Sequence, residues 1–339
     1  MLRIDNVSVT LFSDGINKSS SDTSILKNIS FNVNQGEHLS VVGHSGSGKS
    51  TLLKAIYGLL SLESGQIFYN NKLLLGPEHF LIPGYEFMKY LAQDLGIMPF
   101  ISVRDNIGDF LSNFYPKKKK QKVDELLELV GLSSKANVHV RYLSGGQKQR
   151  VALAKVLALE PQVLLLDEPF SQIDQALKSD LRHRIFTYLK NKNITCITVT
   201  HQVEDILGFA DRVLVLKNGK QVAFDQTDHL VFNPYDRYIS QLFFTVNEIS
   251  AHLLNLDLKH NYTQNVLLYP WEIVVKESHS ASFIVDKCFF SGSHYHIRVV
   301  CGGWSCTAHS QRVFSVGQRV IISCNEDLFL KRIELLFQK

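Results

Sequence analysis

The stretch from His38 to Thr51, HLSVVGHSGSGKST, constrains the fold of this chain more than any other segment. An apolar run suited to a buried strand leads into residues 43–50, which fit the pattern G-x-x-x-x-G-K-[ST], and apolar residues at helical spacing follow. Glycines let backbone N–H groups curl around phosphate oxygens, and the helix N-terminus adds its positive end. Lys49 can reach the outer phosphates, and the Ser50 hydroxyl can bind the accompanying Mg²⁺. A glycine-rich loop that binds nothing is the alternative, and the strand–loop–helix context disfavours it.

The composition is that of an ordinary globular chain with room for two domains: 339 residues, 45% hydrophobic and 20% charged. The net charge of +4 gives no argument for nucleic-acid binding. No apolar run approaches the roughly eighteen residues of a membrane span, and the N-terminus lacks a signal-peptide pattern, so we expect a protein that stays in the cytoplasm. The odd number of cysteines, without metal-type spacing, predicts free and mostly buried thiols at Cys196, Cys288, Cys301, Cys306 and Cys324.

Strand and helix patterns divide the first half of the chain. Alternating apolar residues predict β-structure over residues 1–35, and residues 67–75 form a further strand and turn region. From about residue 101 to 155 the pattern is helical, with one apolar face formed by Val123, Leu126, Leu127 and Val130. The lysine run 117–120 could contact anionic lipid, but a solvated loop or helix start is the favoured interpretation, as for most charge runs.

Residues 143–147, LSGGQ, precede a strongly apolar helix that stops before Pro161. Ser144 can cap this helix, while the two glycines leave its N–H groups open. This is a second helix N-terminus suited to an anion, and two such sites in one chain suggest that phosphate is held from two sides.

Residues 163–166, VLLL, form an apolar run without alternation, which is typical of a parallel strand covered on both faces. Asp167 and Glu168 follow at its carboxyl end, where α/β sheets bind ligands. One acid can hold Mg²⁺, and the other can orient and deprotonate a water that attacks a γ-phosphate; a merely solvated pair is the disfavoured alternative. His201 follows the next strand at the same edge, so it can contact that phosphate or water, although a lone histidine is more often structural.

Taken together, residues 1–235 resemble the ATP-binding subunits of ABC transporters. The matching segments are the Walker A loop, the Q-loop glutamine, the signature LSGGQ, Walker B with its glutamate, the D-loop and the switch histidine, found here at 43–51, Gln93, 143–147, 164–168, 171–174 and His201. The signature is highly specific for this family, and all elements occur in the family's order. The resemblance implies an α/β P-loop NTPase fold, an ABC ATPase domain with a helical subdomain at about 94–155.

The resemblance also implies ATP and Mg²⁺ as cofactors and a homodimer. In this family two ATPase domains pair head to tail, so residues 144–147 serve the partner's nucleotide. Glu168 corresponds to the general base, His201 to the γ-phosphate switch and Lys49 to the lysine on the outer phosphates. The Mg²⁺ ligands implied are Ser50, Gln93 and Asp167. The implied nucleotide-binding residues are Phe12, Gly43, Ser45, Gly46, Ser47, Gly48, Lys49, Ser50, Thr51, Gln93, Ser144, Gly145, Gly146, Gln147 and Asp174.

Two positions depart from the family pattern. The step at which the adenine-stacking aromatic residue usually occurs lands on Leu11, and we choose Phe12, one residue later. The D-loop carries Gln172 and Ile173 where importers usually have smaller or leucine residues. Because no motif residue needed for hydrolysis is missing, we expect an active ATPase.

After Pro234 we expect a helical linker over 236–265 and a β-rich regulatory or dimerisation domain over 266–339. That domain resembles, more loosely, the small β-barrel (OB- or TOBE-like) appended to importer ATPases of the ferric-iron, polyamine, sulfate and molybdate type. His294 and His296 share a strand face, which suggests a metal or anion contact or else an ordinary surface strand. Without a third ligand in the sequence pattern, the surface strand is favoured.

The function implied is that of the energy-coupling ATPase of an ABC importer at the cytoplasmic face of the inner membrane. Its partners would be integral membrane permease subunits and an extracytoplasmic solute-binding protein, with ferric iron or polyamine as the solute by resemblance only. The alternative is a soluble ABC ATPase acting on ribosomes or DNA, which usually carries two cassettes or a long coiled coil. This chain has one Walker A, one signature and no sustained heptads. A regulator that binds ATP without turnover is disfavoured by the intact Asp167, Glu168 and His201.

Overall fold

The computed structural model describes residues 1–11, 23–254, 264–279 and 281–337 and divides the chain into two compact units, Met1–Thr227 and Asp228–Lys339. Within the described ranges, none of the helices has the length and apolar character that crossing a membrane requires. All five cysteines are free and three of them are buried, which confirms the prediction from their number and spacing.

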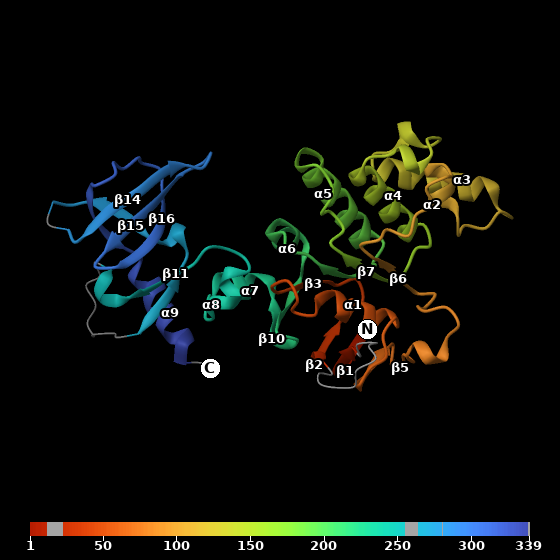
Figure 1. Ribbon diagram of the computed structural model, residues 1–339, viewed down its shortest axis with the longest axis horizontal. Coiled ribbons are helices and arrows are strands. Elements are labelled where there is room, and N and C mark those ends of the chain that lie inside the picture. The colour runs from red at the N-terminus through yellow and green to blue at the C-terminus, as the bar shows by residue number, and fades with distance from the viewer. Residues whose placement is uncertain (12–22, 255–263, 280, 338–339) are drawn as a thin grey trace, which may run out of the picture. The chain divides into compact units, whose positions relative to one another are not determined.

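The first unit is built on a ten-stranded sheet with the strand order β5-β4-β1-β2-β10-β9-β3-β8-β7-β6 (Figure 1). Its strands are β1 (Leu2–Leu11), β2 (Thr23–Val33), β3 (His38–Val42), β4 (Ser64–Tyr69), β5 (Lys72–Leu73), β6 (Met88–Leu91), β7 (Val163–Asp167), β8 (Thr195–Val199), β9 (Arg212–Lys217) and β10 (Lys220–Gln226). Strands β9, β3, β8, β7 and β6 are parallel to one another. Strand β1 is antiparallel to both β2 and β4, and β9 forms a hairpin with β10.

The hairpin between β9 and β10 turns at Asn218 and Gly219, a residue pair favoured in two-residue turns. Both residues have positive φ, 51° and 75°, which is what a tight two-residue turn between twisted strands needs.

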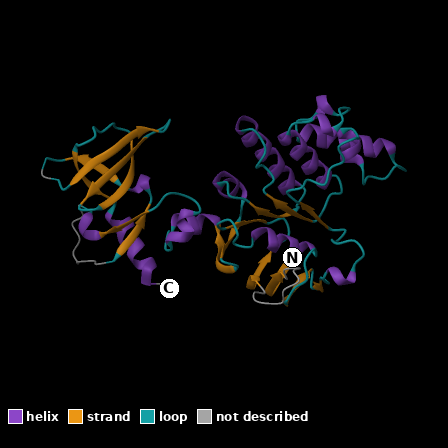
Figure 2. Ribbon diagram, viewed as in Figure 1, coloured by secondary structure: helices purple, strands orange, loops and turns teal. Residues whose placement is uncertain are grey.

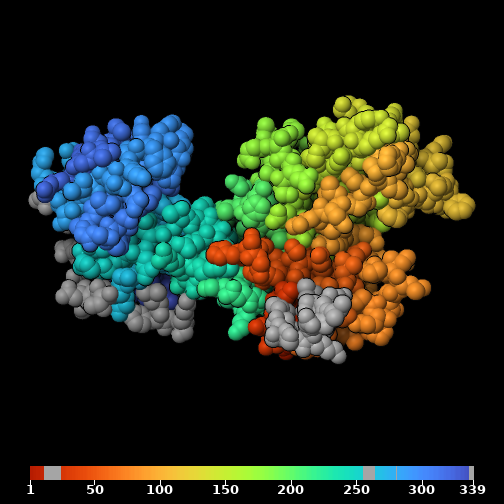
Figure 3. Space-filling view, in the orientation of Figure 1, coloured from red at the N-terminus to blue at the C-terminus, as the bar shows by residue number. Residues whose placement is uncertain are grey.

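The helices of this unit are α1 (Lys49–Tyr57), α2 (Val103–Gly108), α3 (Pro116–Leu129), α4 (Gly145–Leu157), α5 (Gln175–Asn191) and α6 (Val203–Phe209), with short 3₁₀ turns η1 (Pro77–His79), η2 (Ser133–Lys135) and η3 (Val140–Tyr142). Helices α2, α3 and α4 pack on one another. They gather in a lobe at one end of the unit, which Figure 3 shows in gold and yellow. This helical lobe lies in the segment expected to form the helical subdomain.

Helix α3 buries the predicted apolar face: Val123, Leu126, Leu127 and Val130. Pro116 occupies its first position, where the missing N–H costs nothing. The lysine run 117–120 forms the mostly exposed first turns of this helix, in agreement with the favoured interpretation.

The central strands β3, β7 and β8 are buried along their whole length, as expected of parallel strands covered on both faces. Alternate residues of β7 enter different cores. Val163 and Leu165 pack with α1 and the N-terminal strands, whereas Leu164 and Leu166 pack with α4 and α5. Because side chains alternate along a strand, Asp167 lies on the α1 face of the sheet.

The second unit is formed by small antiparallel sheets and a few helices (Figure 2). One sheet pairs β11 with β12, and the other has the order β13-β17-β14-β15-β16. The strands are β11 (Asn247–Ser250), β12 (Asn265–Leu268), β13 (Val274–Glu277), β14 (Phe283–Phe290), β15 (Tyr295–Cys301), β16 (Trp304–Ser310) and β17 (Arg319–Ser323). The helical segments are α7 (Thr227–Phe232), α8 (Arg237–Gln241), η4 (Ala251–Leu253), η5 (Pro270–Glu272) and α9 (Glu326–Phe337). The edge strands β13 and β16 contact each other, so the larger sheet curls into a barrel-like shape.

The prediction of a helical linker over 236–265 is wrong at Asn247–Ser250, which form strand β11. Among the described residues of this segment, only those of α8 and the turn η4 are helical. Ile249 of β11 pairs with Val266 of β12, and both are fully buried. The conformation of β11 depends on pairing with a strand seventeen residues along the chain, and the local apolar pattern cannot indicate such a distant partner. Helix α9 was not expected within the β-rich segment; its Phe329 and Ile333, four residues apart, complete the core of this unit.

Candidate active site

Glycines shape the loop between β3 and α1. A Cβ on Gly43 would lie 2.3 Å from the carbonyl oxygen of Leu216, and one on Gly48 would lie 2.6 Å from Leu26 Cδ2. Both glycines have positive φ, 152° and 98°. Gly48 is the N-cap of α1 and has no side chain with which to cap it, so the positive end of α1 faces the loop with its first N–H groups uncapped. Ser45 and Gly46 at the loop tip are exposed, and this arrangement suits a phosphate group.

Lys49 begins α1, and its ammonium group folds back over the loop. Nζ donates hydrogen bonds to the carbonyl oxygens of Gly43, at 2.8 Å, and of His44, at 3.0 Å. Half-burial lowers the pKa of Lys49, and the carboxylates of Glu168 and Asp167 oppose that shift. The ammonium thus lies between the loop and the two acids at the end of β7.

Asp167 receives hydrogen bonds from two hydroxyl groups. Ser50 Oγ donates to Oδ1 at 3.1 Å, and Tyr90 OH donates to Oδ2 at 3.3 Å. Burial raises the pKa of Asp167, and both hydroxyls lower it. Ser50 and Asp167 therefore offer two oxygen ligands side by side, the type of ligand that Mg²⁺ takes. No sequence motif indicated Tyr90. It lies in β6 and reaches Asp167 because β6 and β7 are neighbours in the sheet.

Glu168 directly follows the last residue of β7 and has a positive φ of 52°. Its N–H donates to the carbonyl oxygen of Val199 in β8. This unusual backbone conformation directs the side chain away from the strand. Glu168 Oε1 lies 3.2 Å from His201 Nδ1, and both side chains are open to solvent, 31% and 63% exposed. The structure therefore joins these two predicted residues at a water-accessible position.

A buried ion pair supports the segment that carries His201. Arg182 of α5 pairs with Asp205 of α6, their side chains being 8% and 2% exposed. Asp205 also accepts a hydrogen bond from Thr200 Oγ1 at 2.7 Å, and Arg182 donates to Gln202 Oε1 at 2.9 Å. The residues on both sides of His201 are thus fixed by one network, which no sequence motif indicated.

The predicted residues meet at one edge of the sheet because the strands before them are parallel. The loop follows β3, Asp167 ends β7, and His201 lies just beyond β8. Gln93 is exposed two residues after β6, whose Leu91 pairs in register with Leu166. Gln93 therefore lies at this same carboxyl edge.

The N-terminus of α4 carries the second predicted anion site. Ser144 Oγ accepts a hydrogen bond from the Gln147 N–H, and the Gln147 side chain accepts one from the Ser144 N–H, which confirms the predicted cap as a reciprocal capping box. Ser144 and Gly145 are exposed. A Cβ on Gly146 would lie 2.7 Å from the carbonyl oxygen of Gln172, so this glycine also allows α4 to approach the chain after β7.

Gln149, 3% exposed, connects α4 to the acids. Its Nε2 donates to the carbonyl oxygen of Glu168 at 2.9 Å, and its Oε1 accepts from the Gln172 N–H at 2.9 Å. The available signal for this role was a glutamine two residues after LSGGQ, within a strongly apolar helix, and it was not recognised as a site residue from the sequence.

Of the remaining predicted residues, Thr51 is in α1, Asp174 is the exposed N-cap of α5, and Phe12 lies outside the described residues.

Comparisons with known proteins agree with this geometry. Residues 26–171 match the ABC transporter family model. Over 222 residues the chain is 35% identical to the Fe(3+) ions import ATP-binding protein FbpC 2 of Haemophilus influenzae, an alignment that covers 65% of this chain and 62% of the relative. The chain thus spans less than two thirds of that relative's length.

Solved structures show the same likeness. The dimeric ATP-binding cassette MJ0796 in a post-hydrolysis state with ADP and Pi is 25% identical, with a TM-score of 0.58 over 67% of this chain and 99% of that one. CbiO1 from Clostridium perfringens, part of the ABC transporter complex cbiONQ, is 28% identical, with a TM-score of 0.57 over 67% of this chain and 89% of that one.

Proposed function

We propose that this chain, whose residues 26–171 match the ABC transporter family model, is the ATP-hydrolysing, energy-coupling subunit of an importer. The observation that carries the proposal is the meeting of Lys49, the Ser50–Asp167 pair and the Glu168–His201 pair at one sheet edge. Each group needed to bind and hydrolyse a nucleoside triphosphate is present there and hydrogen-bonded to a neighbour.

The loop of residues 43–48, the N-terminus of α1 and Lys49 hold the phosphates of ATP. The Lys49 ammonium exchanges its bonds to the loop carbonyls for bonds to the outer phosphate oxygens, which neutralises their charge. Mg²⁺ supplies further positive charge to the β- and γ-phosphates when bound. Ser50 Oγ and Asp167 Oδ1, which are 3.1 Å apart, would hold the ion, and Gln93, two residues after β6, would be a further ligand.

Glu168 accepts the proton of the water that attacks the γ-phosphate. Its carboxylate is partly exposed, so a water can reach it, and its strained backbone fixes where the carboxylate lies. His201 Nδ1 contacts the carboxylate at 3.2 Å, and His201 is the side chain that contacts the γ-phosphate once ATP is bound. The Arg182–Asp205 network keeps the backbone beside His201 in place.

The exposed N-terminus of α4 binds the nucleotide held by a second copy of this chain. Gly145 and Gly146 leave backbone N–H groups open beside the capped Ser144, at the positive end of a thirteen-residue helix. The likeness to the MJ0796 cassette, which is dimeric in its post-hydrolysis state, supports a homodimer of this kind.

The membrane permease contacts the groove beside Gln93. This groove of about 290 Å³ is lined by the segment after β6 and by the helical lobe, including Leu95, Phe110 and Lys155. Phe110 is 63% exposed and Phe100, farther along the same segment, is 70% exposed. Exposed aromatic side chains around a groove are typical of a protein contact surface. The chain would then lie peripherally at the cytoplasmic face of the inner membrane, beside a permease fed by an extracytoplasmic solute-binding protein.

Ferric iron is the solute that we propose, because the curated relative is named as an Fe(3+) importer subunit. Affinity purification of the tagged chain from detergent-solubilised membranes of its own cells, followed by mass spectrometry, tests the transport assignment. We expect a multi-span permease and a solute-binding protein. Ribosomal or DNA-repair proteins without a permease would refute import and leave the ATPase assignment in place.

A further inference from the structure

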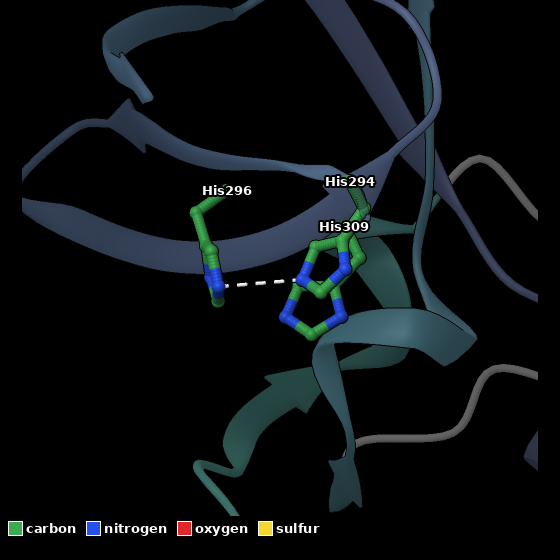
Figure 4. A group of neighbouring side chains, drawn as sticks. All are labelled: His294, His296 and His309. Atoms are coloured by element: carbon green, nitrogen blue, oxygen red, sulfur yellow. Dashed lines mark hydrogen bonds between the residues drawn. The ribbon is translucent and has the colours of Figure 1, made fainter. Parts of the chain in front are cut away.

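Three histidines of the second unit meet on one face of its larger sheet (Figure 4). His296 of β15 and His309 of β16 are directly opposite each other in the antiparallel register. His294 lies in the turn just before β15, and its ring centroid is 4.8 Å from that of His296 and 3.9 Å from that of His309. Their neighbours Ile297 and Ala308 are fully buried on the other face, whereas all three histidines are partly exposed. The third histidine, absent from the local sequence pattern, is supplied by the next strand.

The ligand atoms are close enough to share one ion. One nitrogen from each ring lies within 4.8 Å of the others, and His294 Nε2 is 3.3 Å from His296 Nε2. Two histidine nitrogens on a tetrahedral zinc ion, each at about 2.0–2.1 Å from the metal, are about 3.3–3.4 Å apart. The first pair therefore already has the spacing of two zinc ligands. The rings of His294 and His309 stack with centroids 3.9 Å apart, which places the third ring directly against the first pair.

Surrounding side chains hold two of the rings. Ser293 Oγ lies 2.9 Å from His294 Nδ1, which leaves Nε2 of that ring directed toward the cluster. Phe289 of β14 stacks on His296 with centroids 5.1 Å apart and an angle of 12°. Hydrogen bonding of the second ring nitrogen and an apolar wall are the usual supports of metal-binding histidines.

We propose that His294, His296 and His309 form a binding site for a divalent transition-metal ion of the zinc type, with the fourth position open to water. Imidazole nitrogens suit Zn²⁺ and its transition-metal neighbours, whereas Mg²⁺ and Ca²⁺ need oxygen ligands, and the group that the described residues form contains no carboxylate. Burial and the two neighbouring histidines lower the pKa of His309 to about 4, which agrees with a neutral ring available for coordination. The site lies wholly in the second unit.

Direct metal binding to the full-length, untagged protein tests this site. After chelator treatment the protein is titrated with Zn²⁺ in competition with a chromogenic chelator, and Co²⁺ is then used as a spectroscopic probe. We expect one Zn²⁺ per chain and the strong visible absorption of tetrahedral Co²⁺. His309→Ala should weaken Zn²⁺ binding by at least about 10-fold, since losing even a supporting group costs metal sites this much. His252→Ala, which removes an exposed histidine elsewhere in the same unit, should leave the affinity unchanged.

His294→Ala is a second test because this residue precedes β15 and its loss leaves the strand pairing intact. It should weaken binding as His309→Ala does, while the fluorescence of the two tryptophans, Trp271 and Trp304, reports that the second unit is still folded. The proposal is overturned if Zn²⁺ does not bind the wild type, if both variants bind as tightly as the wild type, or if Co²⁺ gives only the weak absorption of an octahedral complex.

Discussion

Removing Asp205 should destabilise the first unit far more than removing a comparable exposed aspartate. In Asp205→Ala the guanidinium of Arg182, 8% exposed, loses the carboxylate with which it pairs, and the Thr200 hydroxyl loses its acceptor. Arg182 keeps its hydrogen bond to Gln202 at 2.9 Å, which reduces the cost in unfolding free energy but does not neutralise the buried charge.

The cost of Asp205→Ala in unfolding free energy follows from the burial of this ion pair. Removing one partner of a buried ion pair typically costs about 3–5 kcal/mol, and the remaining bond to Gln202 places this variant near the lower end, at about 3 kcal/mol. For a domain of this size, that lowers the melting temperature by about 6–12 °C. Asp180→Ala is the matched control on α5: Asp180 pairs with Arg184 at 3.2 Å but is 75% exposed, so its loss should cost only about 0.2–0.5 kcal/mol.

Unfolding of the full chain in urea, followed by circular dichroism, measures both costs. The transition of the first unit is the one that ATP shifts to higher urea, since ligand binding stabilises only the unit that binds it. Steady-state ATP hydrolysis should also fall for Asp205→Ala, with kcat affected more than KM, because the segment carrying His201 is loosened. A cost below about 1 kcal/mol, the range of exposed pairs, would refute the reasoning that this network is a buried support of the site.

Three further predictions test other parts of the molecule. Glu168→Gln keeps the shape of the side chain but removes the base, so ATP should still bind and the dimer accumulate while phosphate release falls about 10²–10⁴-fold; unchanged release would remove Glu168 from its role. Burial lowers the pKa of His38 to about 4, whereas in the unfolded chain it is about 6.5; the unfolded state therefore takes up a proton first, and stability should fall by about 2 kcal/mol between pH 8 and pH 5. For His38→Phe, urea titrations at pH 8 and pH 5 should show a loss of unfolding free energy about 2 kcal/mol smaller than that of the wild type. Gly146→Ala places a Cβ 2.7 Å from a backbone oxygen of Gln172 and should cost about 1–3 kcal/mol in thermal unfolding. Gly145→Ala, which meets only the end of the Gln172 side chain at 3.0 Å, should cost less.

Local sequence was sufficient for the elements whose structure depends on neighbours a few residues away. The loop of residues 43–48 is recognisable because its three glycines all have positive φ, a backbone requirement set within the loop. The buried strand before Asp167 is recognisable from its unbroken apolar run. The apolar face of α3 and the cap at Ser144 are likewise set by spacings of three and four residues. The same patterns misled over β11, where four residues that follow a helix become a strand only because β12 pairs with them.

The order and chemical type of the nucleotide-site segments could be predicted from the residues alone, since each segment is encoded within a dozen consecutive positions. The distant side chains that support them could not: Tyr90 on Asp167, Gln149 on Glu168, and the Arg182–Asp205 pair beside His201. Strand order and the packing of helices bring these residues together across separations of 19 to 77 positions. The meeting of His309 with His294 and His296 has the same origin, because the register of two antiparallel strands is fixed by the buried face of the sheet and not by the residues on its outer face.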